Sequence, residues 1–232
     1  MIDRILDIFF PPKCPFCKEV LENKIPVCPD CMKKLPFTQE DEQCSICGRP
    51  LEEFSYYTCA SCRGQKMYFE HSFTPLIYKD IAKEGVIALK TSHPYYAKAF
   101  AYLLADRMLS SEYYTSFDCI TFVPQSSRSL KKRGYNQAKL IADELAKILK
   151  VPCIPTLIRT NDGKEQHTLS AAQRRENVKK CYFKTETVGK GTVLLVDDIY
   201  TTGATANYCS KLLKKMGFKK VYLAVALIRD DD

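Results

Sequence analysis

The chain has 232 residues, a formal net charge of +8, and a composition of 46% hydrophobic and 27% charged residues. This balance is typical of a globular protein and excludes a chain that is disordered throughout. The longest strongly apolar runs, Val193–Val196 and Val221–Leu227, are much shorter than the roughly 20 residues that a membrane-spanning helix requires, so we predict no transmembrane segment.

The first segment, Met1–Phe10, is apolar but is interrupted by Asp3 and Asp7. We interpret it as a short docking helix rather than a membrane-surface anchor, and it lacks the pattern of a secretory signal peptide. We therefore expect a cytoplasmic protein in a reducing compartment, where cysteine thiolates bind metals more often than they form disulfides.

Eight of the twelve cysteines form four CxxC pairs, which are separated by ten, twelve and eleven residues and so indicate a duplicated unit. Two CxxC pairs supply the four thiolates of a tetrahedral zinc site, and four sulfurs leave no position for a catalytic water. We predict that residues 1–70 form a double zinc-ribbon module with two structural zinc ions, whose ligands are Cys14, Cys17, Cys28, Cys31, Cys44, Cys47, Cys59 and Cys62.

Sequential pairing of the CxxC motifs is favoured over a crossed arrangement, because each half of the repeat then closes its own site. A redox dithiol or an iron–sulfur site is the competing interpretation of the same motifs. The other four cysteines share no spacing and are expected to be small buried residues; they are Cys119, Cys153, Cys181 and Cys209.

From about Phe73 onward, β-branched and apolar runs alternate with helical patterns, which predicts a parallel sheet flanked by helices in a second domain, residues 71–232. The predicted strands are Asp118–Val123, Thr192–Val196 and Lys220–Leu227, and the predicted helices are Asn136–Leu149 and Ala204–Met216, the latter ended by Gly217.

Basic residues are concentrated in the stretch 124–180, which has 13 Lys or Arg against 5 Asp or Glu. This charge favours a polyanionic partner, either a pyrophosphorylated small molecule or a nucleic acid, over a merely solvated surface. Arg128, Lys131, Lys132 and Arg133 follow a strand end and are expected to meet a pyrophosphate or another polyanion. Asn136 and Gln137 are expected either to cap the next helix or set the loop, or to contact the ligand directly.

The polar segment Asn161–Gln173 is predicted to be a mobile lid that brings Lys164, His167, Arg174 and Arg175 to the ligand. His167 is a candidate general base, although a surface role is favoured.

Four successive apolar residues, Val193–Val196, predict a central strand buried on both faces. Asp197 and Asp198 follow at its carboxyl end, where ligands bind in open α/β sheets. A small, hydroxylated loop then leads into a helix and predicts a phosphate cradle; its residues are Tyr200, Thr201, Thr202, Gly203, Ala204 and Thr205. The lysine of a P-loop is missing, which disfavours nucleoside triphosphate hydrolysis.

The segment Val193–Thr205 resembles the ribose-5-phosphate signature of type I phosphoribosyltransferases. That resemblance implies that Asp197 and Asp198 hold the ribose hydroxyls, that the Thr201–Thr205 loop holds the 5-phosphate, and that the ligand is phosphoribosyl pyrophosphate with Mg²⁺. The resemblance also implies an acceptor pocket formed by a variable hood, which we expect to come from residues before about 75, including the zinc module.

The segments Val123–Ala138, Gln166–Ser170 and Arg174–Val178, together with the paired cysteines, resemble the ComF family of competence proteins over nearly the whole chain. The resemblance implies a role in handling incoming single-stranded DNA, with a helicase or DNA-processing protein as a partner. The alternatives are a phosphoribosyltransferase of nucleotide salvage with an unidentified acceptor, and a phosphoribosyl sensor without turnover. The sequence leaves open whether the chain is an enzyme.

Overall fold

The computed structural model describes residues 11–21, 25–51, 57–91, 93–160, 181–186 and 188–230. The strands are β1 (Ser72–Phe73), β2 (Leu76–Ile77), β3 (Cys119–Phe122), β4 (Leu157–Arg159), β5 (Tyr182–Lys184), β6 (Thr192–Tyr200) and β7 (Lys220–Ile228). The helices are α2 (Pro29–Lys34), η1 (Glu40–Glu42), α3 (Ala60–Arg63), α4 (Asp80–Thr91), η2 (Pro94–Tyr96), α5 (Ala97–Ser110), α6 (Ser127–Arg133), α7 (Gln137–Leu149) and α9 (Ala204–Met216). The expected docking helix at Met1–Phe10 lies outside the described residues.

The main sheet is parallel and is built around the long strands β6 and β7. β3 pairs with β6, while β1 and β2 pair with successive parts of β7. Because β3 ends where Phe122 pairs with Val196, and β6 continues along β7 as far as Tyr200, the last part of β6 has no β3 residue beside it. The predicted parallel sheet with flanking helices is confirmed, and its central strand is four residues longer than the predicted Thr192–Val196.

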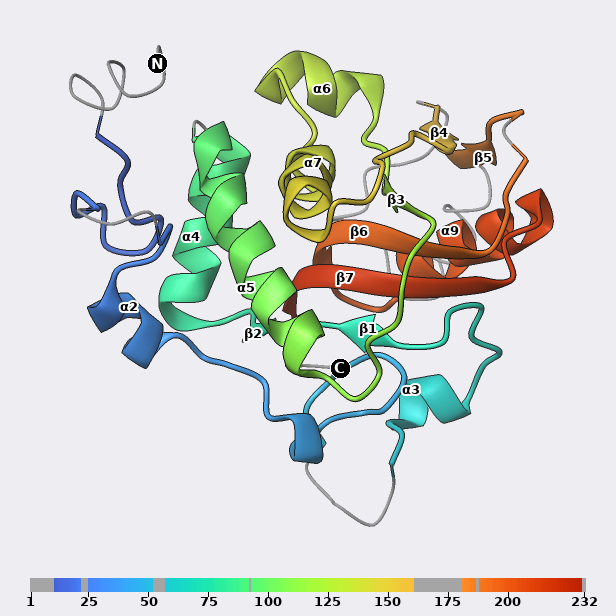
Figure 1. Cartoon of the computed structure of the whole chain (residues 1–232), viewed down its shortest axis with the longest axis horizontal. Helices are drawn as coiled ribbons and strands as arrows, with labels where there is room; N and C mark the ends of the chain where they lie inside the picture. Colours follow the sequence, from blue (N-terminus) through green and yellow to red (C-terminus); the bar gives the residue numbers. More distant parts are fainter. Residues whose placement is uncertain are drawn as a thin grey trace.

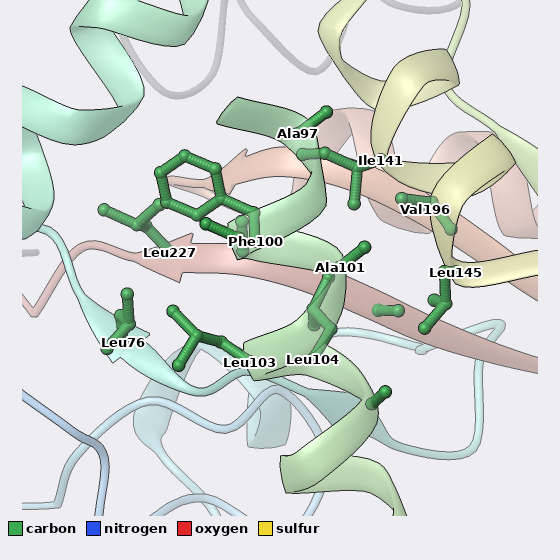
Figure 2. Close-up of a cluster of buried hydrophobic side chains, with 14 of the residues drawn as sticks. Leu76, Ala97, Phe100, Ala101, Leu103, Leu104, Ile141, Leu145, Val196 and Leu227 are labelled. Atoms are coloured by element: carbon green, nitrogen blue, oxygen red, sulfur yellow. The ribbon is translucent and has the colours of Figure 1, made fainter. Parts of the chain in front are cut away.

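One face of the sheet is covered by α4, α5 and α7, and the other by α9 (Figure 1). Alternation along the strands separates the two cores: Leu194 and Val196 of β6 face the first, whereas Val193 and Leu195 face the second. Figure 2 shows how α5 and α7 fill the first core, where Phe100 and Leu104 of α5 and Ile141 of α7 lie over the sheet.

The described part of the cysteine module is a structural repeat. In its first half, the backbone N–H of Cys14 donates to the carbonyl oxygen of Glu19 (2.9 Å), and in its second half that of Cys44 donates to Arg49 (2.7 Å). The residue that follows the first CxxC motif of each half has a positive φ, which is 68° at Lys18 and 75° at Gly48. The duplicated unit expected from the cysteine spacing is therefore present.

The two halves of the module pack into different cores. Phe16 of the first half belongs to the core beneath α4 and α5 and makes an edge-to-face contact with Phe100, with ring centroids 5.9 Å apart. Cys44, Cys47 and Cys62 of the second half belong to the other core, which also contains Tyr200. The second half therefore lies next to the end of β6.

Several elements were not anticipated from the sequence, namely β1, β2, α4 and α5. β4 and β5 form a separate antiparallel pair, in which Ile158 lies opposite Phe183. These strands flank the predicted lid Asn161–Gln173, which lies outside the described residues and stays a prediction.

Candidate functional site

Two clusters of cysteine thiols form the candidate metal centres. The sulfur atoms of Cys14, Cys17, Cys28 and Cys31 lie within 4.8 Å of one another, and so do those of Cys44, Cys47, Cys59 and Cys62. The Sγ atoms of Cys17 and Cys28 are 3.6 Å apart, and those of Cys47 and Cys59 are 3.7 Å apart.

A zinc ion at about 2.3 Å from four tetrahedral sulfurs sets them about 3.8 Å apart, so both clusters fit zinc. The sequential arrangement of ligands is the one present, and the crossed one is excluded. Zinc bound here would hold together a module too small to build a good core of its own, which is a structural role.

The four remaining cysteines belong to neither cluster. Cys119, Cys181 and Cys209 are buried, as expected, whereas Cys153 is only partly buried.

The carboxylates of Asp197 and Asp198 stand on the part of β6 that extends beyond β3. Each is oriented by the backbone, because Asp197 Oδ1 accepts from the N–H of Asp198 and Asp198 Oδ1 accepts from the N–H of Ile199, both at 2.9 Å. The other carboxylate oxygen of Asp198, Oδ2, forms an ion pair with Lys90 Nζ of α4 at 2.8 Å. The Lys90–Asp198 ion pair therefore joins the central strand to a helix that lies about a hundred residues earlier in the chain.

The two neighbouring carboxyl groups have opposite protonation tendencies. Burial, reinforced by the adjacent Asp198, raises the pKa of Asp197 well above its ordinary value. Burial also acts to raise the pKa of Asp198, but the ion pair with Lys90 outweighs it and holds that pKa below its ordinary value. Asp198 is therefore the ionised member of the pair, and Asp197 is the member that keeps a proton more readily.

The loop after β6 turns sharply at Gly203, whose φ is +72° and which precedes the first residue of α9. A side chain at this position would also collide with the hydroxyl of Tyr200, so the turn requires glycine on two counts. Burial, followed by the charge of Cys47 and Cys62, raises the pKa of Tyr200 well above its ordinary value. The predicted cradle is thus a tight turn at a helix N-terminus, with the second cysteine cluster near it.

The basic residues after β3 form α6, which begins at the N-cap Ser126 and ends at Gly134, with a φ of +81°. Arg128, Lys132 and Arg133 line the same cavity as the two aspartates, whereas Lys131 is exposed and does not line it. The helix phase therefore separates Lys131 from its neighbours. Arg174 and Arg175 lie outside the described residues, so their role in binding the pyrophosphate stays a prediction.

Asn136 caps α7, because its side-chain oxygen accepts from the N–H of Lys139 (3.3 Å) and its amide donates to the carbonyl of Val123 (3.0 Å). Gln137 is buried and hydrogen-bonds to Gln125. Of the two roles considered for these residues, the structure shows capping and loop support; Asn136 also borders the cavity.

These groups surround one cavity of about 650 Å³, within the usual range for a small-molecule site. Its described lining includes all eight predicted phosphoribosyl-site residues: Asp197, Asp198, Tyr200, Thr201, Thr202, Gly203, Ala204 and Thr205. Six cationic side chains and two carboxylates border it, so the cavity favours an anionic ligand; the cations are Lys90, Arg128, Lys132, Arg133, Arg159 and Arg229.

Among the lining residues that sequence reasoning missed, five have charged or aromatic side chains: Tyr78, Lys90, Arg159, Tyr182 and Arg229. The guanidinium of Arg229 lies 5.1 Å from the centre of the Tyr78 ring, and that of Arg159 lies 5.1 Å from the Tyr182 ring. Tyr78 and Arg229 directly follow β2 and β7, and this position at the carboxyl end of a strand could have identified them as site residues. Lys90 lies inside an amphipathic helix, where no local sequence pattern distinguishes it from a surface lysine.

The expectation that residues before about 75 wall the cavity is not met in the described chain, since no lining residue there precedes Tyr78. The second cysteine cluster instead lies behind the loop, where Arg49 Nη2 donates to the carbonyl oxygen of Thr201 at 2.8 Å. Over the same described ranges, no helix is both long and apolar enough to cross a bilayer.

Two family models match separate parts of the chain. Residues 5–63 match the double zinc ribbon domain, and residues 129–231 match the phosphoribosyl transferase domain.

Competence protein F of Haemophilus influenzae is 27% identical over 222 residues, covering 92% of this chain and 95% of that protein. The DNA utilization protein YhgH of Escherichia coli O157:H7 is 30% identical over 179 residues, covering 75% of this chain and 78% of that protein. An adenine phosphoribosyltransferase structure from Leishmania tarentolae overlaps 58% of this chain and 71% of its own, with a TM-score of 0.36 and 16% identity. With both cysteine clusters, the phosphoribosyl transferase domain and relatives that match along most of their length, the chain belongs to the ComF family.

Proposed function

We propose that this protein binds phosphoribosyl pyrophosphate, or a closely related phosphoribosyl ligand, and that it acts in natural competence, in the handling of incoming single-stranded DNA. The observation that carries the ligand proposal is the single cavity that unites Asp197 and Asp198, the Thr201–Thr205 loop and the cations of α6. A phosphoribosyl pyrophosphate has a diol, a phosphate and a pyrophosphate, and each finds a suitable partner there.

Each part of the ligand has an assigned partner in this proposal. The ionised Asp198 accepts hydrogen bonds from the ribose hydroxyls, and backbone N–H groups with threonine hydroxyls of the loop hold the 5-phosphate. Arg128, Lys132 and Arg133 face the pyrophosphate. Mg²⁺ would arrive with the pyrophosphate, and it prefers oxygen ligands such as phosphates, water and the two carboxylates.

The ligand proposal is tested by calorimetric titration of the zinc-loaded protein with phosphoribosyl pyrophosphate and Mg²⁺. Saturable binding that is lost in the double variant Asp197→Asn/Asp198→Asn is the expected result. Asp143→Asn is the matched control, because Asp143 lies on α7 outside the cavity and pairs with Lys139 on the surface. Equal binding by the double variant would refute the assignment of the site.

The competence part of the proposal is supported by the names of the relatives, a competence protein and a DNA utilization protein. It is tested by titration with single-stranded DNA over a series of salt concentrations, where the affinity should fall steeply as salt rises. Lys131→Ala is informative, because Lys131 is exposed and lies outside the cavity. If α6 contacts DNA, this change lowers the salt slope by about 0.7 without altering the affinity for the phosphoribosyl ligand.

A transferase reaction with an acceptor is the second candidate, and one observation favours it. Tyr78 and Arg229, at the ends of β2 and β7, also line the cavity and supply an aromatic ring and a cation that an acceptor would contact. Pyrophosphate release in the presence of a panel of bases and amines tests it. Release that depends on one acceptor and is lost in Asp197→Asn/Asp198→Asn would establish an enzyme.

A further inference from the structure

The second zinc ribbon, residues 44–62, and the residues directly after it contact the Thr201–Thr205 loop on both sides of its turn. Ahead of the turn at Gly203, Arg49 donates from Nη2 to the carbonyl oxygen of Thr201 at 2.8 Å. After the turn, Asn207 in the first turn of α9 accepts from the N–H of Tyr68 (2.8 Å) and donates to the carbonyl oxygen of Lys66 (2.9 Å). The loop between these contacts is therefore held from one side by a segment more than 130 residues away in sequence.

The Arg49 contact fixes the direction of a backbone donor. A trans peptide is planar, and its C=O and N–H groups point in opposite directions. Because the carbonyl of Thr201 points at Arg49, the N–H of Thr202 in the same peptide points away from the zinc ribbon. Thr202 lines the cavity, so this arrangement suits an N–H group that serves an anion.

The zinc knuckle itself does not require an arginine at this position. Glu19 occupies the equivalent place in the first ribbon, where its carbonyl accepts from Cys14 just as that of Arg49 accepts from Cys44. The Glu19 side chain is exposed, whereas Arg49 is only 5% exposed. Burying a guanidinium is costly unless it is hydrogen-bonded, which points to a purpose beyond the fold of the knuckle.

We propose that Arg49 and Asn207 are positioning residues, through which the second zinc ribbon holds the phosphate-binding loop in its binding conformation. The described part of the first ribbon instead packs on α5 through Phe16. This inference rests on the proposed phosphoribosyl site and adds a division of labour between the two zinc ribbons. A preformed loop binds phosphate more tightly because less ordering accompanies binding.

The test uses the full chain with both zinc sites loaded and ribose 5-phosphate as the probe. Arg49→Ala and Asn207→Ala should each weaken ribose 5-phosphate binding by about tenfold, with the zinc content unchanged. Arg49→Lys, which keeps one donor and the charge, should recover part of the affinity. Glu19→Ala, the equivalent change in the first ribbon, should bind as the original protein does.

Amide hydrogen exchange of the 200–206 segment provides a measurement that needs no ligand. Exchange there should accelerate in Arg49→Ala and Asn207→Ala and stay unchanged in Glu19→Ala. Unchanged exchange and unchanged affinity in both loop variants would overturn the inference. A third outcome is that exchange accelerates in the variants but the original protein does not bind ribose 5-phosphate. That outcome would refute the phosphoribosyl site, whereas the role of Arg49 and Asn207 in holding the loop would stand. If Arg49→Ala loses zinc, Arg49→Lys and Asn207→Ala decide.

Discussion

Lys90 Nζ on α4 lies 2.8 Å from Asp198 Oδ2 on β6, in a pair whose side chains are 24% and 16% exposed. This contact keeps one of the two adjacent carboxylates ionised, although both stand on a largely buried strand. Its contribution to stability can be measured by unfolding experiments.

Lys90→Met should lower the free energy of unfolding at pH 7 by roughly 1–3 kcal/mol, because it leaves a partly buried carboxylate without its cation. Because the pKa of Asp198 is lowered in the folded state, the ion pair with Lys90 stabilises the protein above the ordinary aspartate pKa of about 3.9. That stabilisation is lost as the pH falls through the folded-state pKa of Asp198. The difference between variant and original protein should therefore persist from pH 8 to about pH 5 and shrink below about pH 4. Urea unfolding monitored by circular dichroism measures it.

Lys147→Met is the control for this pair. Lys147 makes an ion pair of similar length with Glu144, 2.6 Å, but its side chain is 69% exposed. Such surface pairs contribute less than about 1 kcal/mol. Equal losses in the two lysine variants would show that the Lys90 pair is no better shielded than a surface pair.

Asp197→Asn should stabilise the protein at neutral pH while weakening the phosphoribosyl site. The pKa of Asp197 is raised in the folded state, so ionisation of this carboxyl group costs stability. The cost is absent below the pKa that Asp197 has in the unfolded state, and it grows as the pH rises through the pKa that it has in the folded state. We expect a gain of the order of 1 kcal/mol at pH 7 that disappears near pH 4. Thermal unfolding at several pH values, next to titration with phosphoribosyl pyrophosphate, checks both effects. A variant less stable than the original at pH 7 would contradict the protonation argument.

Gly203→Ala should destabilise the protein by more than Gly134→Ala. Both glycines have a positive φ, +72° and +81°, so both substitutions carry the strain of a left-handed alanine, roughly 1–2 kcal/mol. An added methyl group meets nothing within 4 Å at Gly134, whereas at Gly203 it collides with Tyr200. The difference between the two free energies of unfolding isolates this collision. If Gly134→Ala proved the more damaging change, the tight packing of the loop against Tyr200 would be disproved.

Protein purified without chelator should contain two zinc ions per chain, one for each cysteine cluster. Removal of the metal should lower the unfolding temperature, because the folded module then loses the free energy of its metal–sulfur bonds and has little core of its own. Metal analysis and calorimetry before and after chelation provide the measurement. Fewer than one zinc ion per chain, or iron with sulfide in its place, would refute the assignment.

Much of the fold follows from local sequence patterns. The helix Ala204–Met216 has the predicted limits, and α7 begins within one residue of the prediction, because Gly217 and the capping Asn136 act on their immediate neighbours. The cysteine clusters were predictable for a similar reason, since each metal site is closed by a loop of ten or eleven residues. The end of β6 was misjudged, because Asp197 and Asp198 interrupt its apolar pattern while the strand continues along β7.

The sequence by itself determined the two zinc clusters, the carboxylate pair and the glycine turn that opens α9, because each depends on residues close together in the chain. Only the tertiary structure decided that Lys90 neutralises Asp198, that Lys132 but not Lys131 reaches the cavity, and that Arg49 lies behind Thr201. These relationships depend on the order of strands in the sheet and on how the flanking elements pack against it. Contacts of that kind join residues separated by about 65 to 150 positions, and no local spacing records them.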